Sequence, residues 1–97
     1  MVLYMKKKII DIEAHAFFRL MERGTQFGLS FEETKERSFN AVRNGKLSVR
    51  KHKSRKGKTY YHYFKDNLSF YVMCQEREYD DYIKVLIKTV IIEEGRG

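Results

Sequence analysis

The sequence lacks several features that would define its class. It contains no proline and no tryptophan, and its single cysteine, Cys74, excludes an intrachain disulfide and a zinc site built on several thiolates. No apolar run approaches the roughly 20 residues that a membrane-spanning helix needs. Residues 1–8 show no long apolar stretch after their charges, which makes them a poor signal peptide. We therefore expect a soluble cytoplasmic protein with no membrane partner.

Acidic residues are missing from one long stretch of the chain. Between Glu36 and Asp66 there is no Asp or Glu, whereas this interval holds ten of the 20 Lys and Arg residues. The whole chain carries a formal net charge of +7. This imbalance favours a polyanionic partner, and nucleic acid is the first candidate.

The first part of the chain predicts a strand and a helix. Residues 2–10 are mixed apolar and basic, which is typical of a short strand. A helix is expected over residues 12–23, with Asp11 as its N-cap and Gly24 closing it in a left-handed conformation. Helical periodicity gathers its apolar side chains on one side, which we expect to be the packed side: Ala14, Phe17, Phe18, Leu20 and Met21.

A second helix is predicted from a capping-box pattern. Ser30 is followed three residues later by Glu33, whose carboxylate can accept a hydrogen bond from the Ser30 backbone. The helix should run over residues 31–44, and Asn44 followed by Gly45 should end it.

Beyond Lys46 the apolar residues recur every second position, which predicts strands. Residues 54–58 have the composition of a hairpin tip, with Gly57 supplying a positive φ. This tip would place Val49 beside Phe64. The next tip is expected at residues 65–67, with Asn67 in the left-handed region.

The last two strands are predicted around an acidic turn at residues 76–81. The preceding strand should point Leu68, Phe70, Val72 and Cys74 toward the core. The last strand should cover residues 82–92, and its core face is expected to carry Ile83, Val85, Ile87, Thr89 and Ile91. The fold class that follows is α+β, with two N-terminal helices packed on one face of a mostly antiparallel four- to five-stranded sheet, in one domain over residues 1–97.

The basic stretch combines cations with tyrosines. Cations neutralise phosphates while aromatic rings stack on unpaired bases, so this combination favours single-stranded nucleic acid. The alternative is a solvated edge hairpin whose lysines prevent aggregation. The residues predicted to contact nucleic acid are Arg50, His52, Lys53, Arg55, Lys56, Lys58, Tyr61 and Tyr63.

One helix face carries a candidate for phosphate chemistry. His15, Arg19 and Arg23 recur every four residues and share a side of the first helix. A histidine can exchange a proton with a ribose hydroxyl or a leaving oxygen, and guanidinium groups can hold the phosphate. The alternative is an ordinary solvated helix face. His62 falls on the predicted core face, where a hydrogen-bonded, partly buried histidine is the simpler interpretation. The histidines are not spaced as metal ligands, so we expect neither a metal site nor a cofactor.

The run His15-Ala16-x-x-Arg19-x-Met21-x-Arg23-Gly24, followed by Leu29-Ser30-x-Glu32-Glu33, resembles the small RelE/BrnT-like toxin domains of the barnase–EndoU–colicin–RelE ribonuclease fold. The resemblance implies two helices before a meandering antiparallel sheet and a metal-independent ribonuclease activity. It also implies catalytic roles for His15, Arg19 and Arg23, and for Thr89 on the last strand.

Two functions remain open from the sequence. The first is a ribonuclease toxin of a toxin–antitoxin pair, which cleaves single-stranded or ribosome-bound RNA by attack of the 2′-hydroxyl on the adjacent phosphate and is covered by an acidic antitoxin. The second is a non-catalytic nucleic-acid-binding module. A protein-interaction domain is a third and weaker alternative.

The ribonuclease hypothesis predicts growth arrest when the protein is expressed. His15→Ala and Arg19→Ala should each relieve the arrest if these side chains transfer the proton and hold the phosphate. Colony counts after induction measure the effect, and circular dichroism checks that the variants fold. Full toxicity of both folded variants would contradict this assignment.

Overall fold

The computed structural model describes residues 6–48 and 57–97, and the remaining residues lie outside the description. Its elements follow one another in the predicted order of strand, two helices and four strands. They are β1 (Lys7–Ile12), α1 (Ala14–Thr25), α2 (Phe31–Asn44), β2 (Lys46–Leu47), β3 (Gly57–Tyr63), β4 (Leu68–Glu78) and β5 (Tyr82–Glu94).

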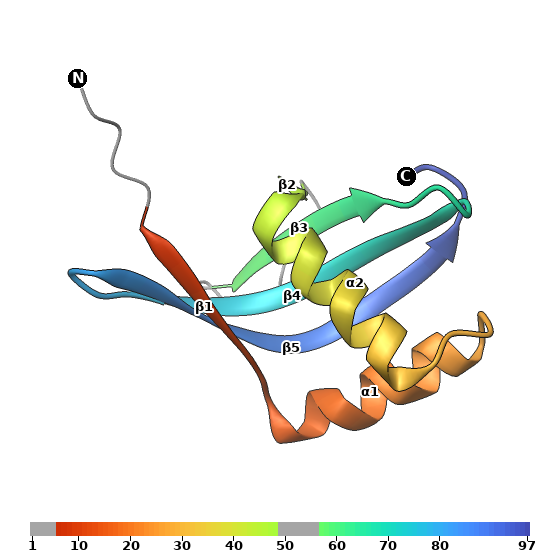
Figure 1. Ribbon diagram of the computed structural model, residues 1–97, viewed down its shortest axis with the longest axis horizontal. Coiled ribbons are helices and arrows are strands. Elements are labelled where there is room, and N and C mark those ends of the chain that lie inside the picture. The colour runs from red at the N-terminus through yellow and green to blue at the C-terminus, as the bar shows by residue number, and fades with distance from the viewer. Residues whose placement is uncertain (1–5, 49–56) are drawn as a thin grey trace.

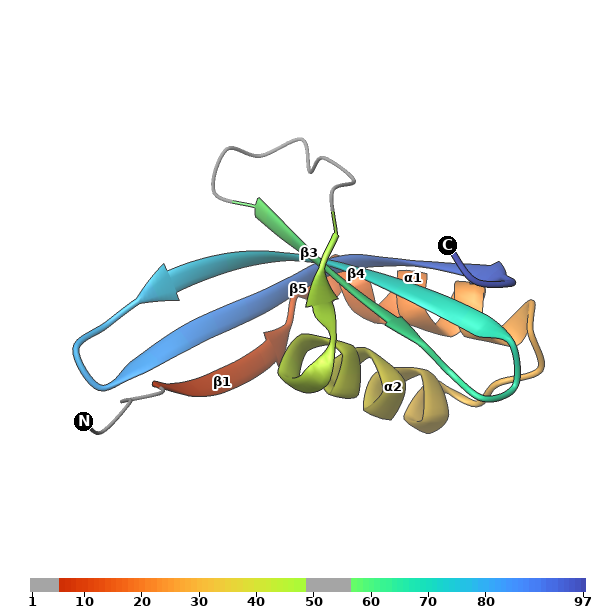
Figure 2. The same ribbon diagram turned by 90° about the horizontal axis from the view of Figure 1, so that it is seen from above.

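The five strands form one sheet in the order β1-β5-β4-β3-β2. Strand β1 runs parallel to β5, and every other neighbouring pair is antiparallel. Both helices lie against the same face of the sheet, which we call the inner face (Figures 1 and 2). The opposite face is the outer face. The predicted α+β class is therefore confirmed.

The core lies between the inner face and the two helices. Strand β4 points Phe70, Val72 and Cys74 into it, and all three side chains are fully buried, as predicted. Helix α2 packs on β3 and β4, and α1 packs on β5. The β4–β5 hairpin extends beyond the helices (Figure 1).

Helix α2 has the predicted bounds and the predicted capping box. The Ser30 Oγ accepts from the Glu33 N–H at 3.1 Å, and the Glu33 Oε1 accepts from the Ser30 N–H at 3.1 Å. These two bonds satisfy N–H groups that a helix start leaves without partners.

Helix α1 differs from the prediction in its start and in its packed side. Its N-cap is Glu13, whereas the Asp11 carboxylate accepts from the neighbouring Ile12 N–H and caps nothing. The buried positions are Ala16, Leu20 and Gly24. The exposed apolar residues include Phe17 at 42%, Phe18 at 73% and Met21 at 49% exposed surface. Leu20 and the small residues Ala16 and Gly24 face the sheet and α2, whereas Phe17 stays partly exposed and stacks on the Phe31 ring of α2 with 5.5 Å between ring centres.

The sequence predicted that Gly24 ends α1 in a left-handed conformation, and this prediction is wrong. It lies inside the helix, and a Cβ there would come within 2.0 Å of the Thr34 Oγ1 on α2. The Thr34 hydroxyl is fixed because it donates to the Ser30 carbonyl at 2.9 Å. The left-handed glycine of this connection is Gly28, with φ of 74°.

A β-bulge changes the predicted inner face of β5. Met73 pairs with Thr89 and Cys74 pairs with Ile87, so Lys88 is the extra residue. One inserted residue reverses the alternation that follows it. Val90 and Ile92 therefore reach the core, and the predicted Thr89 and Ile91 lie on the outer face.

The β2–β3 pairing has a different register from the predicted one. Lys46 pairs with Tyr61 and Leu47 with Tyr60, and Val49, the predicted neighbour of Phe64, lies outside the described residues. Gly57 begins β3 opposite Gln75. Residues 54–56 of the expected tip lie outside the described part of the chain.

Of the predictions for the two later turns, one is confirmed and one is partly wrong. The prediction for Asn67 is confirmed, with φ of 68°, and His62 pairs with Phe70 as expected. The acidic turn is shorter than predicted, because β4 continues to Glu78. Glu76 is a strand residue whose carboxylate pairs with the Lys58 ammonium at 3.1 Å.

The Gly24 contact predicts a specific loss of stability. Gly24→Ala should lower the free energy of unfolding by about 1–3 kcal/mol, because the added methyl overlaps the Thr34 hydroxyl. Urea unfolding measures this value. In a double-mutant cycle with Thr34→Ala the two losses should be less than additive. Additive losses would show that the two residues do not contact each other.

Candidate nucleic-acid interface

One hollow on the surface joins parts of the chain that are distant in sequence. It encloses about 490 Å³ between the end of α2, β2, β3 and the residues after β5. We call it the tyrosine groove, and its lining is Asn44, Gly45, Lys46, Tyr61, His62, Tyr63, Arg96 and Gly97.

Gly45 positions the α2 side of the tyrosine groove. Its N–H donates to the Ala41 carbonyl at 2.8 Å, which ends α2. A Cβ at Gly45 would lie 2.5 Å from the Tyr61 carbonyl oxygen and 2.4 Å from the Ala41 oxygen. Only glycine fits this close approach of α2 to β3, and the approach places Lys46 directly opposite Tyr61.

Hydrogen bonds fix residues 95–97 on the other side of the groove. The Gly97 N–H donates to the Tyr61 hydroxyl at 3.1 Å, and that hydroxyl lies 3.3 Å from the Ser69 Oγ. The Ser69 hydroxyl donates in turn to the Gly95 carbonyl. This chain of bonds holds the intervening Arg96, whose guanidinium lies 4.9 Å from the centre of the Tyr63 ring.

A second hollow of about 610 Å³ adjoins the first. We call it the hairpin groove, and its lining is Glu36, Arg37, Asn40, His62, Tyr63, Phe64, Lys65 and Asp66. The two grooves share His62 and Tyr63, which are successive residues of β3. These two residues point to opposite faces of the sheet, so the grooves meet around the end of β3.

An ion pair removes much of the negative charge of the hairpin groove. The Arg37 guanidinium makes two contacts of 2.8 Å with the Asp66 carboxylate. The hydrogen bond from Arg37 is the main reason that the pKa of Asp66 lies below its usual value. Arg37 also lies 5.0 Å from the centre of the Phe64 ring, which fixes its orientation.

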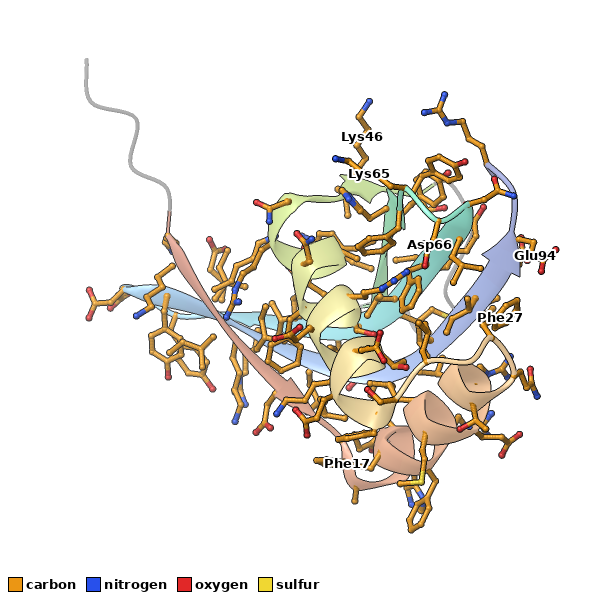
Figure 3. The ribbon with its side chains drawn as sticks, turned by 45° about the vertical axis from the view of Figure 1, so that its right-hand side comes forward. Phe17, Phe27, Lys46, Lys65, Asp66 and Glu94 are labelled. Carbon is orange, nitrogen blue, oxygen red and sulfur yellow. The ribbon has the colours of Figure 1, made fainter. Side chains whose placement is uncertain are left out.

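The remaining cations of the two grooves are Lys46, Lys65 and Arg96. None of them forms an ion pair with any residue in the described ranges 6–48 and 57–97. Lys46 and Lys65 project from the same end of the molecule, and Phe17 lies at the opposite end (Figure 3). As far as the described residues show, the two grooves therefore present positive charge without acidic partners beside two tyrosine rings.

Two of the predicted nucleic-acid contacts line the tyrosine groove. Tyr61 and Tyr63 are half-buried, and the Tyr61 ring lies 5.0 Å from the Tyr71 ring. Lys58 is exposed but points to the inner face, where Glu76 pairs with it. The other predicted contacts lie outside the described residues: Arg50, His52, Lys53, Arg55 and Lys56.

The predicted catalytic residues do not form a single cluster. His15 and Arg19 are exposed and Arg23 is half-buried along one side of α1. Thr89 pairs with Met73 and lies on the outer face, whereas α1 covers the inner face. The structure therefore separates Thr89 from the α1 stripe, and none of the four lines either groove.

Cys74 is a core residue rather than a nucleophile. Burial raises the pKa of its thiol to about 12, and the nearby Glu76 carboxylate adds to this effect. Burial also raises the pKa of the neighbouring Tyr60 hydroxyl, which donates to Glu76 and accepts from the Lys8 ammonium at 3.2 Å. These groups form a structural network on the inner face.

Sequence reasoning did not select Lys46, His62, Lys65 or Arg96 as site residues. Arg96 follows the last strand, and no motif marks it. Only the hydrogen bonds of Gly95 and Gly97 bring it to Tyr63. The alternation of β3 did predict that His62 and Tyr63 face opposite sides of the sheet. It could not predict how α2 and β2 lie around them, because that depends on the register between β2 and β3.

Within residues 6–48 and 57–97, no group of three or more His, Cys, Asp or Glu side chains could hold a metal ion. Neither α1 nor α2 is long and apolar enough to cross a membrane. Comparison of the chain with protein-family models, curated proteins and solved structures gives no match. The grooves are therefore interpreted from their own chemistry.

The Arg37–Asp66 pair predicts a pH-dependent contribution to stability. The folded-state pKa of Asp66 is lowered, so the contribution is present above the ordinary carboxyl pKa and is lost as pH falls through the folded-state value. Asp66→Asn should cost roughly 0.5 kcal/mol at pH 7, because the pair is partly exposed. Thermal unfolding from pH 7 to pH 2 should show the two proteins converging. A difference that stays constant with pH would contradict this.

Proposed function

We propose that this protein binds single-stranded RNA across the tyrosine and hairpin grooves. The observation that carries the proposal is the junction of the grooves, where Lys46, Lys65 and Arg96 surround Tyr63 without ion-pair partners in the described ranges. Free cations can neutralise phosphates, and the Tyr63 and Arg96 planes can stack on bases.

The shape of the grooves favours a single strand over a duplex. The two hollows are local and meet at a bend around the end of β3. A flexible strand can follow such a bend, whereas a rigid duplex cannot without deformation. Asn40 lines the hairpin groove and Asn44 lines the tyrosine groove. The Asn44 amide donates to the Asn40 Oδ1 at 2.6 Å, which leaves the Asn40 N–H groups and the Asn44 Oδ1 to bond base edges.

Ribonuclease activity of the toxin kind is the second candidate function. Two features support it: the sequence resemblance to RelE/BrnT-like domains, and a histidine, His62, at the junction of the grooves. A toxin of this kind would be neutralised by an acidic antitoxin, and the net charge of +7 would favour such a partner.

The proposal predicts which cations contribute to RNA binding. Lys46→Ala and Arg96→Ala should each weaken binding of a short single-stranded RNA about tenfold, because each removes a phosphate contact. Tyr63→Ala should weaken it through lost stacking, by roughly 1–3 kcal/mol per base. Fluorescence anisotropy over a range of salt concentrations measures both the affinity and its salt dependence.

Lys84→Ala is the matched control for charge. It changes the net charge by the same amount, but Lys84 is exposed on β5 and lines a separate hollow with Gln75 and Arg77. Binding should therefore change less than about twofold in this variant. Equal losses in Lys84→Ala and Lys46→Ala would show that only overall charge matters and would contradict the proposed grooves.

A further inference from the structure

We propose that His62 is the proton-transferring residue of a metal-independent RNA cleavage at the junction of the two grooves. The inference rests on the proposed RNA binding and assigns the chemistry to β3. The helix histidine His15, which the sequence singled out, would have no catalytic role.

The position of His62 is the first reason. It is the only histidine in the described residues that lines a groove, and it lines both. His62 is half-buried, and its ring packs edge-on against the Phe64 ring with 4.6 Å between the ring centres. This contact restricts the orientation of the His62 ring. No hydrogen bond within residues 6–48 and 57–97 engages either ring nitrogen, so His62 is not the satisfied core histidine that the sequence suggested.

The surrounding charge is the second reason. Helix α2 contributes Glu36 and Arg37 to the hollows that His62 lines, and the β3–β4 turn contributes Lys65 and Asp66. Lys46 and Arg96 come from β2 and from the residues after β5. Arg37 neutralises Asp66, which leaves Lys65 and Glu36 in the hairpin groove, while Lys46 and Arg96 line the tyrosine groove across the end of β3.

His15 does not have such surroundings. It lies exposed at the start of α1, and the charged groups that share its helix face are Arg19, Glu22 and Arg23. It lines neither groove. A phosphate bound at α1 would therefore meet an open helix surface, whereas a phosphate bound at the junction beside His62 would be within the two hollows that Lys46, Lys65 and Arg96 line.

The cleavage is an internal transfer within the RNA. His62 takes the proton of a ribose 2′-hydroxyl, whose oxygen forms a bond to the adjacent phosphorus while the bond from phosphorus to the 5′-oxygen breaks. The 5′-oxygen takes a proton from solvent water, and His62 returns its proton to the hydroxide formed. The products are a 2′,3′-cyclic phosphate and a 5′-hydroxyl, and no water is consumed. Lys46, Lys65 and Arg96 stabilise the charge that develops on the phosphate.

The experiment uses the full chain and a labelled single-stranded RNA in the presence of a chelator. The RNA should be cut to fragments with 2′,3′-cyclic phosphate ends, and DNA of the same sequence should remain intact. His62→Gln should slow cleavage by about 100-fold or more, because an amide cannot transfer the proton. RNA affinity should change less than about threefold. Lys84→Gln, on β5 and away from both grooves, is the matched control and should cleave as the wild type does.

His62→Ala with added imidazole separates proton transfer from a structural role. Free imidazole should restore part of the lost cleavage, which it cannot do if the variant only disturbs packing against Phe64. RNA binding without cleavage by the wild type would overturn this inference and leave the proposed binding function standing. Cleavage that survives His62→Gln but is lost in His15→Gln would assign the reaction to α1 and would also overturn it. Absence of RNA binding would instead contradict the proposed function itself.

Discussion

Helix α2 is held at both ends by contacts that leave no room for a side chain. Near its start, Thr34 lies against Gly24 of α1, and just beyond its end Gly45 lies against the Tyr61 carbonyl of β3. These contacts fix the distance and direction of α2 relative to the sheet. The core beneath it and the grooves beside it therefore share one constraint, because the same helix covers Phe70 and forms a wall for His62.

The elements that sequence reasoning predicted well are those with local signals. The Ser30 capping box gave the start of α2, and Asn67 gave the β3–β4 turn. Features without a local signal were missed. The observed partner of Leu47 is Tyr60, which lies six residues before its partner in the predicted register. Because six is an even number, Leu47 stays on the same face of the sheet in both registers, and the alternation of apolar residues could not distinguish them. The bulge at Lys88 exchanges the faces of β5 although nothing in its composition marks it.

Residues of the candidate site were likewise predicted only where a local sequence signal marks them. Tyr61 and Tyr63 could be selected from composition, because aromatic residues stand beside cations in the sequence. Arg96 could not, since 33 positions separate it from Tyr63 and only hydrogen bonds from Gly95 and Gly97 join them. The α1 stripe shows the opposite case, in which a regular spacing of His15, Arg19 and Arg23 predicts a cluster that the fold leaves on an open surface.

The parallel pairing of β1 with β5 has a consequence for how the chain is made. Lys7 lies opposite Tyr82 and Ile12 opposite Ile87, so β1 cannot pair until β5 has been synthesised. During synthesis β1 emerges from the ribosome long before its partner exists, and the row of N–H and C=O groups on β1 stays unpaired in the meantime. Pairing between strands so distant in sequence slows folding, and the addition of β1 to the sheet is therefore one of the last steps in the folding of a new chain.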